Sequence, residues 1–207
     1  MVVVLIAGAS GSGKSTLSLK IVCEVGAAAV IEMDWYYSHR TKIRDLSVLE
    51  VLSAFDIQRL KRDITELITK GTTLAPQYSF LLSRRSKRVK RIKRQPVVII
   101  EGLYALTLKR FLEKQNVTVI SAFLECEKNV LLGRRLQRDL SRTGQTRAEI
   151  IDQFEKHVYP AYVRYIRKQE SLADVAITHS SMANERALLK RIAIAVKEDQ
   201  KKRERTY

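Results

Sequence analysis

The apolar residues of this chain fall into short continuous runs, and segments with helical spacing lie between them. Unbroken runs of aliphatic and β-branched residues are typical of strands that are buried on both faces of a sheet. Such runs occupy residues 2–7, 28–31, 97–100, 117–124 and 175–178. Helical spacing covers residues 15–25, 46–70, 106–115, 128–140, 147–169 (with a kink near Pro160) and 184–196. Strands that alternate with helices predict an α/β fold, in which helices cover both faces of a parallel sheet.

Two extended arms, residues 72–80 and 86–94, interrupt this alternation. They predict a β-hairpin, over about residues 72–95, that projects from the core. The second arm belongs to a basic run, residues 84–94, in which eight of eleven residues are Lys or Arg. A solvated hairpin is the simpler interpretation of this run. The sharper interpretation is an electrostatic funnel for a phosphorylated or polymeric acceptor, such as an RNA end.

Composition limits the class of protein. With 207 residues, 45% of them hydrophobic, the chain can form one compact domain, so we expect a single domain over residues 1–207. No apolar run approaches the roughly 20 residues that cross a bilayer, and the start of the chain lacks a secretory pattern, so we expect a cytoplasmic protein. Cys23 and Cys126 are too few for a disulfide scaffold, and we expect both in the core. The net charge of +16 favours polyanionic partners.

The first predicted strand leads into the sequence GASGSGKS, residues 8–15, which matches the GxxxxGK[ST] pattern at every fixed position. Glycines let such a loop wrap a phosphate with its backbone N–H groups pointing inward, and the helix that follows adds its positive end. We expect Lys14 to reach the β- and γ-phosphates and the Ser15 hydroxyl to bind Mg²⁺. The expected nucleotide-binding residues are Gly8, Ser10, Gly11, Ser12, Gly13, Lys14, Ser15 and Thr16.

Two carboxylates follow predicted core strands: Asp34 after the second strand and Glu101 after residues 97–100. Ligands of open parallel sheets collect at these strand ends. Phosphoryl transfer needs a bound metal and a carboxylate that takes the proton of the attacking hydroxyl. Asp34 is therefore the candidate general base and Glu101 a candidate metal ligand, with a helix cap or a backbone-bonded carboxylate as the simpler alternative for each. Aromatic residues at positions 35–37, 78 and 80 would stack on a nucleobase or pack in the core.

Taken together, these segments resemble the uridine kinase (uridine–cytidine kinase) family, which is related to the phosphoribulokinases. The resemblance covers residues 2 to about 178. The matching segments are GASGSGKST (8–16), DWYY (34–37), PQYSF (76–80), VVIIEG (97–102) and RRLQRD (134–139), similar to the family's phosphate loop and its D-x-F-Y, P-x-Y-D-F, V-V-I-x-E-G and R-R-x-x-R-D segments.

This resemblance implies a P-loop kinase fold: a three-layer sandwich with a five-stranded parallel core, a β-hairpin beside the acceptor pocket, and a helical, arginine-bearing lid at about residues 134–147. It implies that Arg135 and Arg138 contact phosphates during transfer. It also implies an acceptor pocket formed by Tyr37, Glu50, Tyr78, Phe80, Arg135 and Gln153.

Several base-reading positions depart from the family pattern. The family's N-F-D-H-P segment is replaced by residues 48–52, in which the only acid is Glu50. Ser79 replaces an aspartate, Ser83 stands where the pyrimidine kinases carry a histidine, and residues 141–145 replace an arginine-containing stretch of the lid. The residues expected to transfer the phosphate are thus retained, while those expected to contact the base are altered.

We therefore expect an enzyme: a kinase that uses ATP, or another nucleoside triphosphate, and Mg²⁺ to phosphorylate a hydroxyl, first of all the 5′-hydroxyl of uridine or cytidine. The expected catalytic residues are Asp34, Lys14, Arg135 and Arg138, and the expected metal ligands are Ser15, Glu101 and Asp34. A kinase of another nucleoside-like alcohol or a sugar phosphate is the alternative. A nucleic-acid-binding protein that uses ATP as a switch ranks below both. A homo-oligomer is left open, and no membrane partner is expected.

Overall fold

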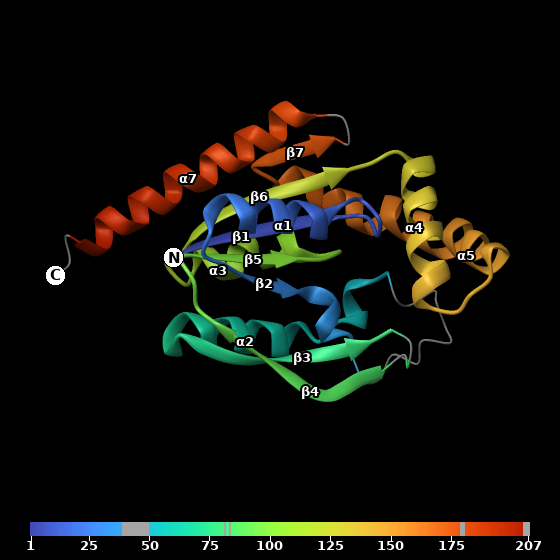
Figure 1. Ribbon diagram of the computed structural model, residues 1–207, viewed down its shortest axis with the longest axis horizontal. Helices are drawn as coiled ribbons and strands as arrows, with labels where there is room; N and C mark the ends of the chain where they lie inside the picture. Colours follow the sequence, from blue (N-terminus) through green and yellow to red (C-terminus); the bar gives the residue numbers. More distant parts are fainter. Residues whose placement is uncertain (39–49, 81, 83, 179–180, 205–207) are drawn as a thin grey trace.

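The computed structural model describes residues 1–38, 50–80, 82, 84–178 and 181–204. Its core is a five-stranded sheet in the order β2-β5-β1-β6-β7 (Figure 1). The strands are β1 (Val2–Gly8), β2 (Ala28–Glu32), β5 (Val97–Glu101), β6 (Thr118–Glu125) and β7 (Val175–Thr178). All neighbouring pairs run parallel, so the predicted α/β fold with a five-stranded parallel core is confirmed.

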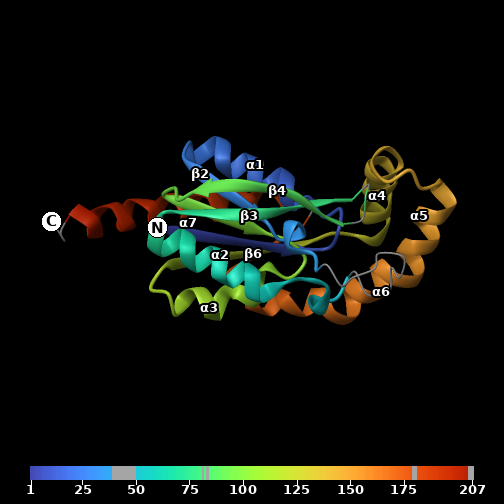
Figure 2. The same ribbon diagram turned by 90° about the horizontal axis from the view of Figure 1, so that it is seen from below.

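Both faces of the sheet are buried, as its central strand β1 illustrates. Val3 and Leu5 belong to one hydrophobic cluster, whereas Val2 and Val4 belong to the other. Because successive side chains of a strand point to opposite faces, an unbroken apolar run supplies both clusters. One face is covered by α1 (Lys14–Val25) and α7 (Met182–Glu204), and the other by α2 (Ile57–Lys70), α3 (Lys109–Glu113) and the helical segments that follow residue 153 (Figures 1 and 2).

Helix α2 begins later than its apolar spacing predicted. The prediction covered residues 46–70, but the helix begins at Ile57, because the Asp56 side chain accepts a hydrogen bond from the Arg59 amide at 3.0 Å and caps it. Before the cap, Leu52–Ala54 form a single 3-10 turn, and residues 46–49 lie outside the described residues.

Other predicted helices also differ in extent. In place of the helix predicted over residues 106–115, the chain forms a 3-10 turn, Ala105–Leu108, followed by the short helix α3. Helix α7 is longer than predicted at both ends. The predicted helix over residues 147–169 is divided into α5 (Arg147–Gln153), two π turns (Phe154–Val158 and Tyr162–Ile166) around α6 (Tyr159–Ala161), and a final 3-10 segment. Pro160 lies between the two π turns, and its missing N–H and its ring account for the break in the regular helix.

The predicted hairpin is present as a separate antiparallel pair, β3 (Thr72–Ser79) and β4 (Arg84–Lys93). It packs against α2 through its buried residues Ala75 and Ile92. The register of the hairpin shifts between Pro76 and Tyr78, which marks a bulge near its tip. At this tip the chain brings Tyr78 and Phe80 towards the core sheet.

Two further predictions can be compared with the structure. Cys126 is buried, but Cys23 is exposed, so the prediction of a core position is wrong for Cys23. Cys23 lies two residues after the buried Ile21, about 200° around the helix, and therefore on the opposite face of α1. Among the described residues, no helix is long and apolar enough to cross a membrane.

Candidate active site

A cavity of about 1030 Å³ lies at the carboxyl ends of the core strands. This is where ligands of open α/β sheets bind. Except for Gly8, every predicted site residue lines the cavity, so the structure brings together residues that are far apart in the sequence. They are Ser10, Gly11, Ser12, Gly13, Lys14, Ser15, Thr16, Asp34, Tyr37, Glu50, Tyr78, Phe80, Glu101, Arg135, Arg138 and Gln153.

The loop between β1 and α1 has a backbone that requires glycine. Gly13, directly before α1, has a φ of 102°. This value lies in the left-handed region, where the backbone of any residue with a side chain is strained. A Cβ atom on Gly8 would lie 2.6 Å from the carbonyl oxygen of Leu124 in β6. The loop thus delivers the chain to the N-terminus of α1, where backbone N–H groups and the helix dipole favour an anion.

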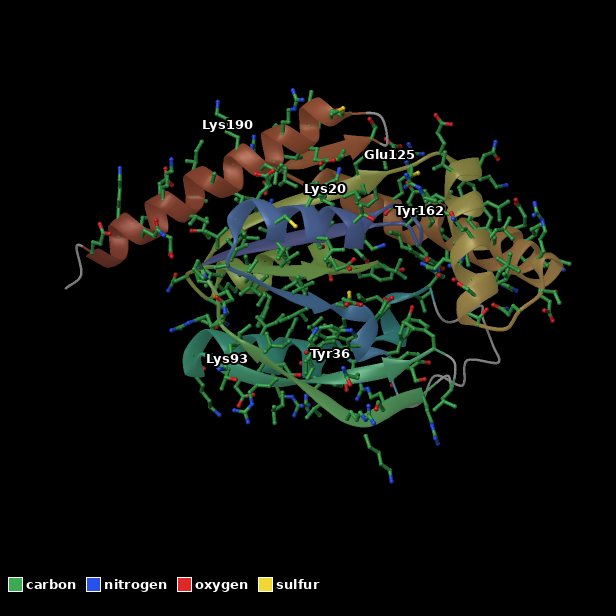
Figure 3. The ribbon with its side chains drawn as sticks, in the orientation of Figure 1. Lys20, Tyr36, Lys93, Glu125, Tyr162 and Lys190 are labelled. Carbon is green, nitrogen blue, oxygen red and sulfur yellow. The ribbon has the colours of Figure 1, made fainter. Side chains whose placement is uncertain are left out.

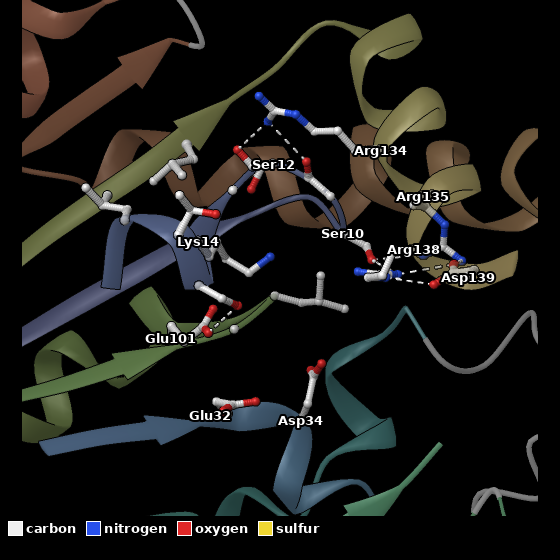
Figure 4. A pocket seen from close by; sticks show the side chains of 18 of the residues that line it. Ser10, Ser12, Lys14, Glu32, Asp34, Glu101, Arg134, Arg135, Arg138 and Asp139 are labelled. Atoms are coloured by element: carbon white, nitrogen blue, oxygen red, sulfur yellow. Dashed lines mark hydrogen bonds and ion pairs between the residues drawn. The ribbon is translucent and has the colours of Figure 1, made fainter. Parts of the chain in front are cut away.

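Lys14 lies at the centre of the cavity. Its Nζ atom donates hydrogen bonds to the carbonyl oxygens of Gly8 (3.1 Å) and Ala9 (2.8 Å). Burial lowers the pKa of Lys14, and the charges of Glu101, Asp34 and Glu50 oppose that shift. Figure 4 shows Asp34 directed into the cavity on the side opposite the loop. One lysine is therefore surrounded by three carboxylates.

The carboxylates next to Ser15 form a set of oxygen donors. The Ser15 hydroxyl donates a hydrogen bond of 2.6 Å to Oε1 of Glu101. Burial raises the pKa of Glu101, although Lys14 and Ser15 oppose that shift. Glu32, which the sequence analysis missed, pairs in register with Glu101 across β2 and β5 and also lines the cavity.

This donor set fits Mg²⁺ and does not form a complete metal cage. Among the described residues, no group of three or more His, Cys, Asp or Glu side chains is arranged to hold a metal ion. Mg²⁺ is usually bound through one or two carboxylates together with substrate phosphates, and a serine hydroxyl beside a carboxylate suits that mode.

Two arginines of α4 (Lys128–Arg142) converge on the phosphate loop. Nη1 of Arg135 and Nη2 of Arg138 donate hydrogen bonds to the Ser10 hydroxyl at 2.9 Å and 3.2 Å. Asp139 contacts both guanidinium groups, at 3.3 Å from Nη2 of Arg135 and 2.7 Å from Nε of Arg138. The neighbouring Arg134 instead donates to the carbonyl oxygens of Gly11 and Ser12. Arg135 and Arg138 are three residues apart and therefore share one face of α4. They are the pair held at the mouth of the loop (Figure 4).

An aromatic cluster forms another end of the cavity. Tyr37 stacks on Phe55 with ring centroids 4.4 Å apart, and its centroid lies 5.2 Å from Tyr78 and 6.2 Å from Phe80. Burial raises the pKa of Tyr78 to about 12, with a contribution from the charge of Asp34. The Tyr78 hydroxyl therefore stays protonated at neutral pH.

Two polar atoms at this end are buried without a hydrogen-bond partner among the described residues: the Tyr78 hydroxyl and Oε2 of Glu50. Buried polar atoms are normally paired, so their position indicates a polar group of a ligand. Glu50 is also 3.7 Å from the Arg135 guanidinium. Gln153, the last predicted acceptor residue, accepts a hydrogen bond from Gln145 at 3.4 Å. The altered positions 48, 49 and 83 lie outside the described residues.

Arg85 is a further residue that the sequence analysis did not single out. It was predicted only as one member of the basic run, yet its guanidinium donates to the carbonyl oxygens of Tyr37 (2.8 Å) and Tyr36 (3.3 Å) and to Asp56 (3.1 Å). It therefore ties the hairpin to the segment that carries Asp34. Nothing in the sequence distinguishes Arg85 from the other bases of the run.

The cavity extends past the loop to the start of α7. Its lining there includes Thr178, Ser181 and Met182. Lys20 of α1 and Glu185 of α7 close this end with an ion pair of 2.8 Å. The sequence analysis assigned no site residue here, because β7 and α7 carry no recognisable motif.

Solved structures define the class of protein that has this fold. A Silicibacter protein provisionally assigned as a fructose transport system kinase aligns with a TM-score of 0.66 and 23% identity, over 86% of this chain and 89% of that protein. Phosphoribulokinase from Rhodobacter spheroides aligns with a TM-score of 0.56 and 16% identity, over 85% of this chain and 69% of that protein. At these identities the likeness shows the fold alone, and the fold is that of the P-loop kinases.

Sequence comparison then identifies the family. Residues 3–187 match the model of the phosphoribulokinase / uridine kinase family. Uridine kinase from Deinococcus deserti is 30% identical over 192 residues, which are 90% of this chain and 91% of the relative. Uridine kinase from Aeromonas salmonicida is 30% identical over 186 residues, 85% of this chain and 86% of the relative. The chain belongs to the phosphoribulokinase / uridine kinase family, which confirms the predicted resemblance and the prediction of an ATP-dependent phosphotransferase with an alcohol acceptor.

Proposed function

We propose that this protein transfers the γ-phosphoryl group of ATP, with Mg²⁺, to the 5′-hydroxyl of uridine or cytidine. Relatives named uridine kinase, 28–30% identical over most of their length, support the proposal. The observation that carries it is the continuity of one cavity from the phosphate loop to an aromatic end with two buried, unpartnered polar atoms. A nucleoside would bring a flat ring for Tyr37, Tyr78 and Phe80, and ribose hydroxyls for Glu50 and Tyr78.

The donor site in this proposal is centred on residues 8–15. The loop N–H groups and Lys14 bind the phosphates, and the N-terminus of α1 favours their negative charge. Ser15, Glu101 and Asp34 are the proposed Mg²⁺ ligands, because they supply oxygen atoms at the strand ends beside the loop. The bound metal offsets charge on the phosphate oxygens.

In the proposed reaction, the acceptor oxygen forms a bond to the γ-phosphorus while the bond between that phosphorus and the bridging oxygen of the ADP leaving group breaks. Asp34 accepts the proton of the acceptor hydroxyl, since it is the carboxylate whose charge acts on Lys14 at the loop and on both Tyr37 and Tyr78 at the acceptor end. Arg135 and Arg138 stabilise the charge that develops on the transferred group.

A second acceptor class is favoured by one observation at the hairpin tip. Ser79 replaces the aspartate of the family pattern, and its hydroxyl accepts a hydrogen bond from the Leu82 amide at 3.3 Å, within the turn. Ser79 thus serves the hairpin turn at a position where the family pattern has an aspartate. Another nucleoside-like alcohol or a sugar phosphate is therefore the second candidate acceptor for the same chemistry.

A coupled assay of ADP formation across nucleosides and sugar phosphates, with ATP and Mg²⁺, tests both candidates. We expect uridine or cytidine to give the highest kcat/KM, with the 5′-monophosphate as the product identified by mass spectrometry and NMR. Turnover of another alcohol without turnover of either pyrimidine nucleoside would establish the second candidate. Absence of acceptor-dependent ADP formation with every compound would contradict both. The Tyr78→Phe variant provides a site control, since it should raise the KM of the acceptor and leave that of ATP unchanged.

A further inference from the structure

The β3–β4 hairpin carries a one-sided charge. Its two strands contain seven basic residues and no acidic residue. The six bases other than Arg85 are exposed, and within the described part of the chain none of those six forms an ion pair with a carboxylate. They are Arg84, Lys87, Arg88, Lys90, Arg91 and Lys93. Ion pairs within the described part of the chain therefore do not neutralise these charges.

The strand geometry directs Arg91 and Lys93 to one face of β4, and Lys87 follows nearer the hairpin tip. Because Ile92 is buried, Val89, Arg91 and Lys93, which pair with β3 in unbroken register, point to the opposite, outer face of β4, and Lys87 is exposed beyond the register shift. Arg91 and Lys93 are two residues apart, about 6.8 Å along the strand, which suits successive phosphates of an extended chain, and Lys87 lies four residues from Arg91. We call Lys87, Arg91 and Lys93 the basic outer row. The partner of Arg91 on β3, Leu74, is 44% exposed, and Val89 is 54% exposed, so the surface is open to solvent.

The inner side of the same strand adds an aromatic ring. Trp35, Gln77 and Arg88 line an open pocket beside Tyr78, which also forms a wall of the large cavity. Lys90 places its ammonium 4.6 Å from the centroid of the Trp35 ring. An indole with a lysine ammonium over its ring, in a pocket beside a basic strand, combines the two elements that single-strand binding surfaces use: aromatic stacking and phosphate neutralisation.

We propose that this hairpin binds single-stranded nucleic acid along β4, with backbone phosphates at the basic outer row and a base against Trp35. In the described structure β4 pairs only with β3, so its other edge is free (Figure 1). Charge on edge strands also discourages pairing between sheets, but that role does not need an aromatic ring in a pocket beside the bases. The surface lies beside the active site and is separate from the proposed phosphate transfer.

Fluorescence anisotropy with a labelled single-stranded RNA tests the proposal, with the matching DNA strand as a second probe. The test variant K87Q/R91Q/K93Q removes the outer row, and the control K190Q/R191Q/K197Q removes the same charge from exposed positions on α7. Figure 3 shows Lys93 and Lys190 on opposite sides of the molecule. Thermal unfolding checks that both variants fold.

We expect wild-type affinity to fall steeply between about 50 and 200 mM salt, with the salt slope smaller by about 2 in the outer-row variant. That variant should bind at least about tenfold more weakly, and the α7 variant should bind like the wild type. Equal losses in the two variants would show a diffuse effect of net charge and overturn the proposal. Binding to anionic vesicles without binding to RNA or DNA would overturn it as well.

The placement of a base can be followed through Trp35, because it is the only tryptophan in the chain. Saturating RNA should change the intrinsic tryptophan emission of the wild-type and α7-variant proteins, and Arg88→Gln should reduce both the emission change and the affinity. Unchanged emission at saturation, with anisotropy showing full binding, would refute the contact between a base and Trp35.

Discussion

Replacing Arg135 with methionine should separate its stabilising contacts from its proposed part in phosphate transfer. Its side chain is only 6% exposed. The guanidinium lies 2.9 Å from the Ser10 hydroxyl, 3.7 Å from Glu50 and 3.3 Å from Asp139. Asp139 keeps its ion pair with Arg138 in the variant, at 2.7 Å. Glu50 is therefore the carboxylate that loses its cation.

The expected loss of stability follows from this geometry. Removing one partner of a buried ion pair destabilises a protein by about 3–5 kcal/mol. Protonation of Glu50 limits that cost, because burial already raises its pKa and the charge of Arg135 opposes that shift. When folding raises the pKa of a carboxyl group, that group destabilises the folded state at higher pH. The destabilisation develops as the pH rises from the pKa of the unfolded state, about 4.3, towards the pKa of the folded state. The Arg135→Met variant should thus be less destabilised at about pH 5 than at about pH 8.

Urea unfolding at both pH values and steady-state kinetics at saturating substrates measure the two effects. We expect kcat to fall by about 10²–10³-fold. Adding Glu50→Gln removes the unpaired carboxylate, so R135M/E50Q should regain stability without regaining kcat. The exposed Arg110→Met, on α3, is the matched control and should change neither quantity. The reasoning is refuted if R135M unfolds within about 0.5 kcal/mol of the wild type, or if the double variant recovers full kcat.

Three further predictions concern the hairpin, the metal site and the loop. Arg85→Met removes the hydrogen bonds to the carbonyl oxygens of Tyr36 and Tyr37. It should raise the KM of the acceptor about tenfold while the KM of ATP stays constant. Equal changes in both KM values would contradict a positioning role for Arg85. Burial raises the pKa of Glu101 above the ordinary value of about 4.3, so kcat/KM should fall as the pH decreases through that raised pKa. This decrease at low pH should be missing from the residual activity of Glu101→Gln. Gly8→Ala, which places a Cβ atom 2.6 Å from a β6 carbonyl oxygen, should destabilise the fold by about 1–3 kcal/mol in thermal or denaturant unfolding, and wild-type stability would contradict the close approach.

The elements that could be predicted from the sequence are those with local causes. The apolar run of β1 leads directly into the glycine loop and α1, and each of these requires residues that are adjacent in the chain. Asp34 and Glu101 could be placed at strand ends because parallel strands bring their carboxyl ends to one edge of the sheet. The residues that line the cavity therefore come mostly from segments whose order along the chain already indicates a nucleotide site.

What could not be predicted depends on one helix start and on contacts between distant segments. The apolar spacing of α2 continues upstream of Ile57, and only the Asp56 cap shows where the helix begins. Arg85 has the same residue type as its neighbours, and its partners, the Tyr37 carbonyl among them, are some thirty to fifty residues away. Glu32 faces Glu101 only because β2 and β5 pair in that register. For Arg85 and Glu32 the decisive contact is a long-range one that the local pattern does not encode, whereas the Asp56 cap is a local contact with the Arg59 amide.

The proposed mechanism rests on Asp34 as the carboxylate that takes the proton of the acceptor hydroxyl. The most direct test compares Asp34→Asn with the exposed control Asp152→Asn, by calorimetric titration of ATP and by steady-state turnover with uridine or cytidine. We predict that Asp34→Asn keeps its affinity for ATP while kcat falls by about 10²–10⁴-fold, and that the control retains both. Wild-type turnover by Asp34→Asn would contradict the mechanism.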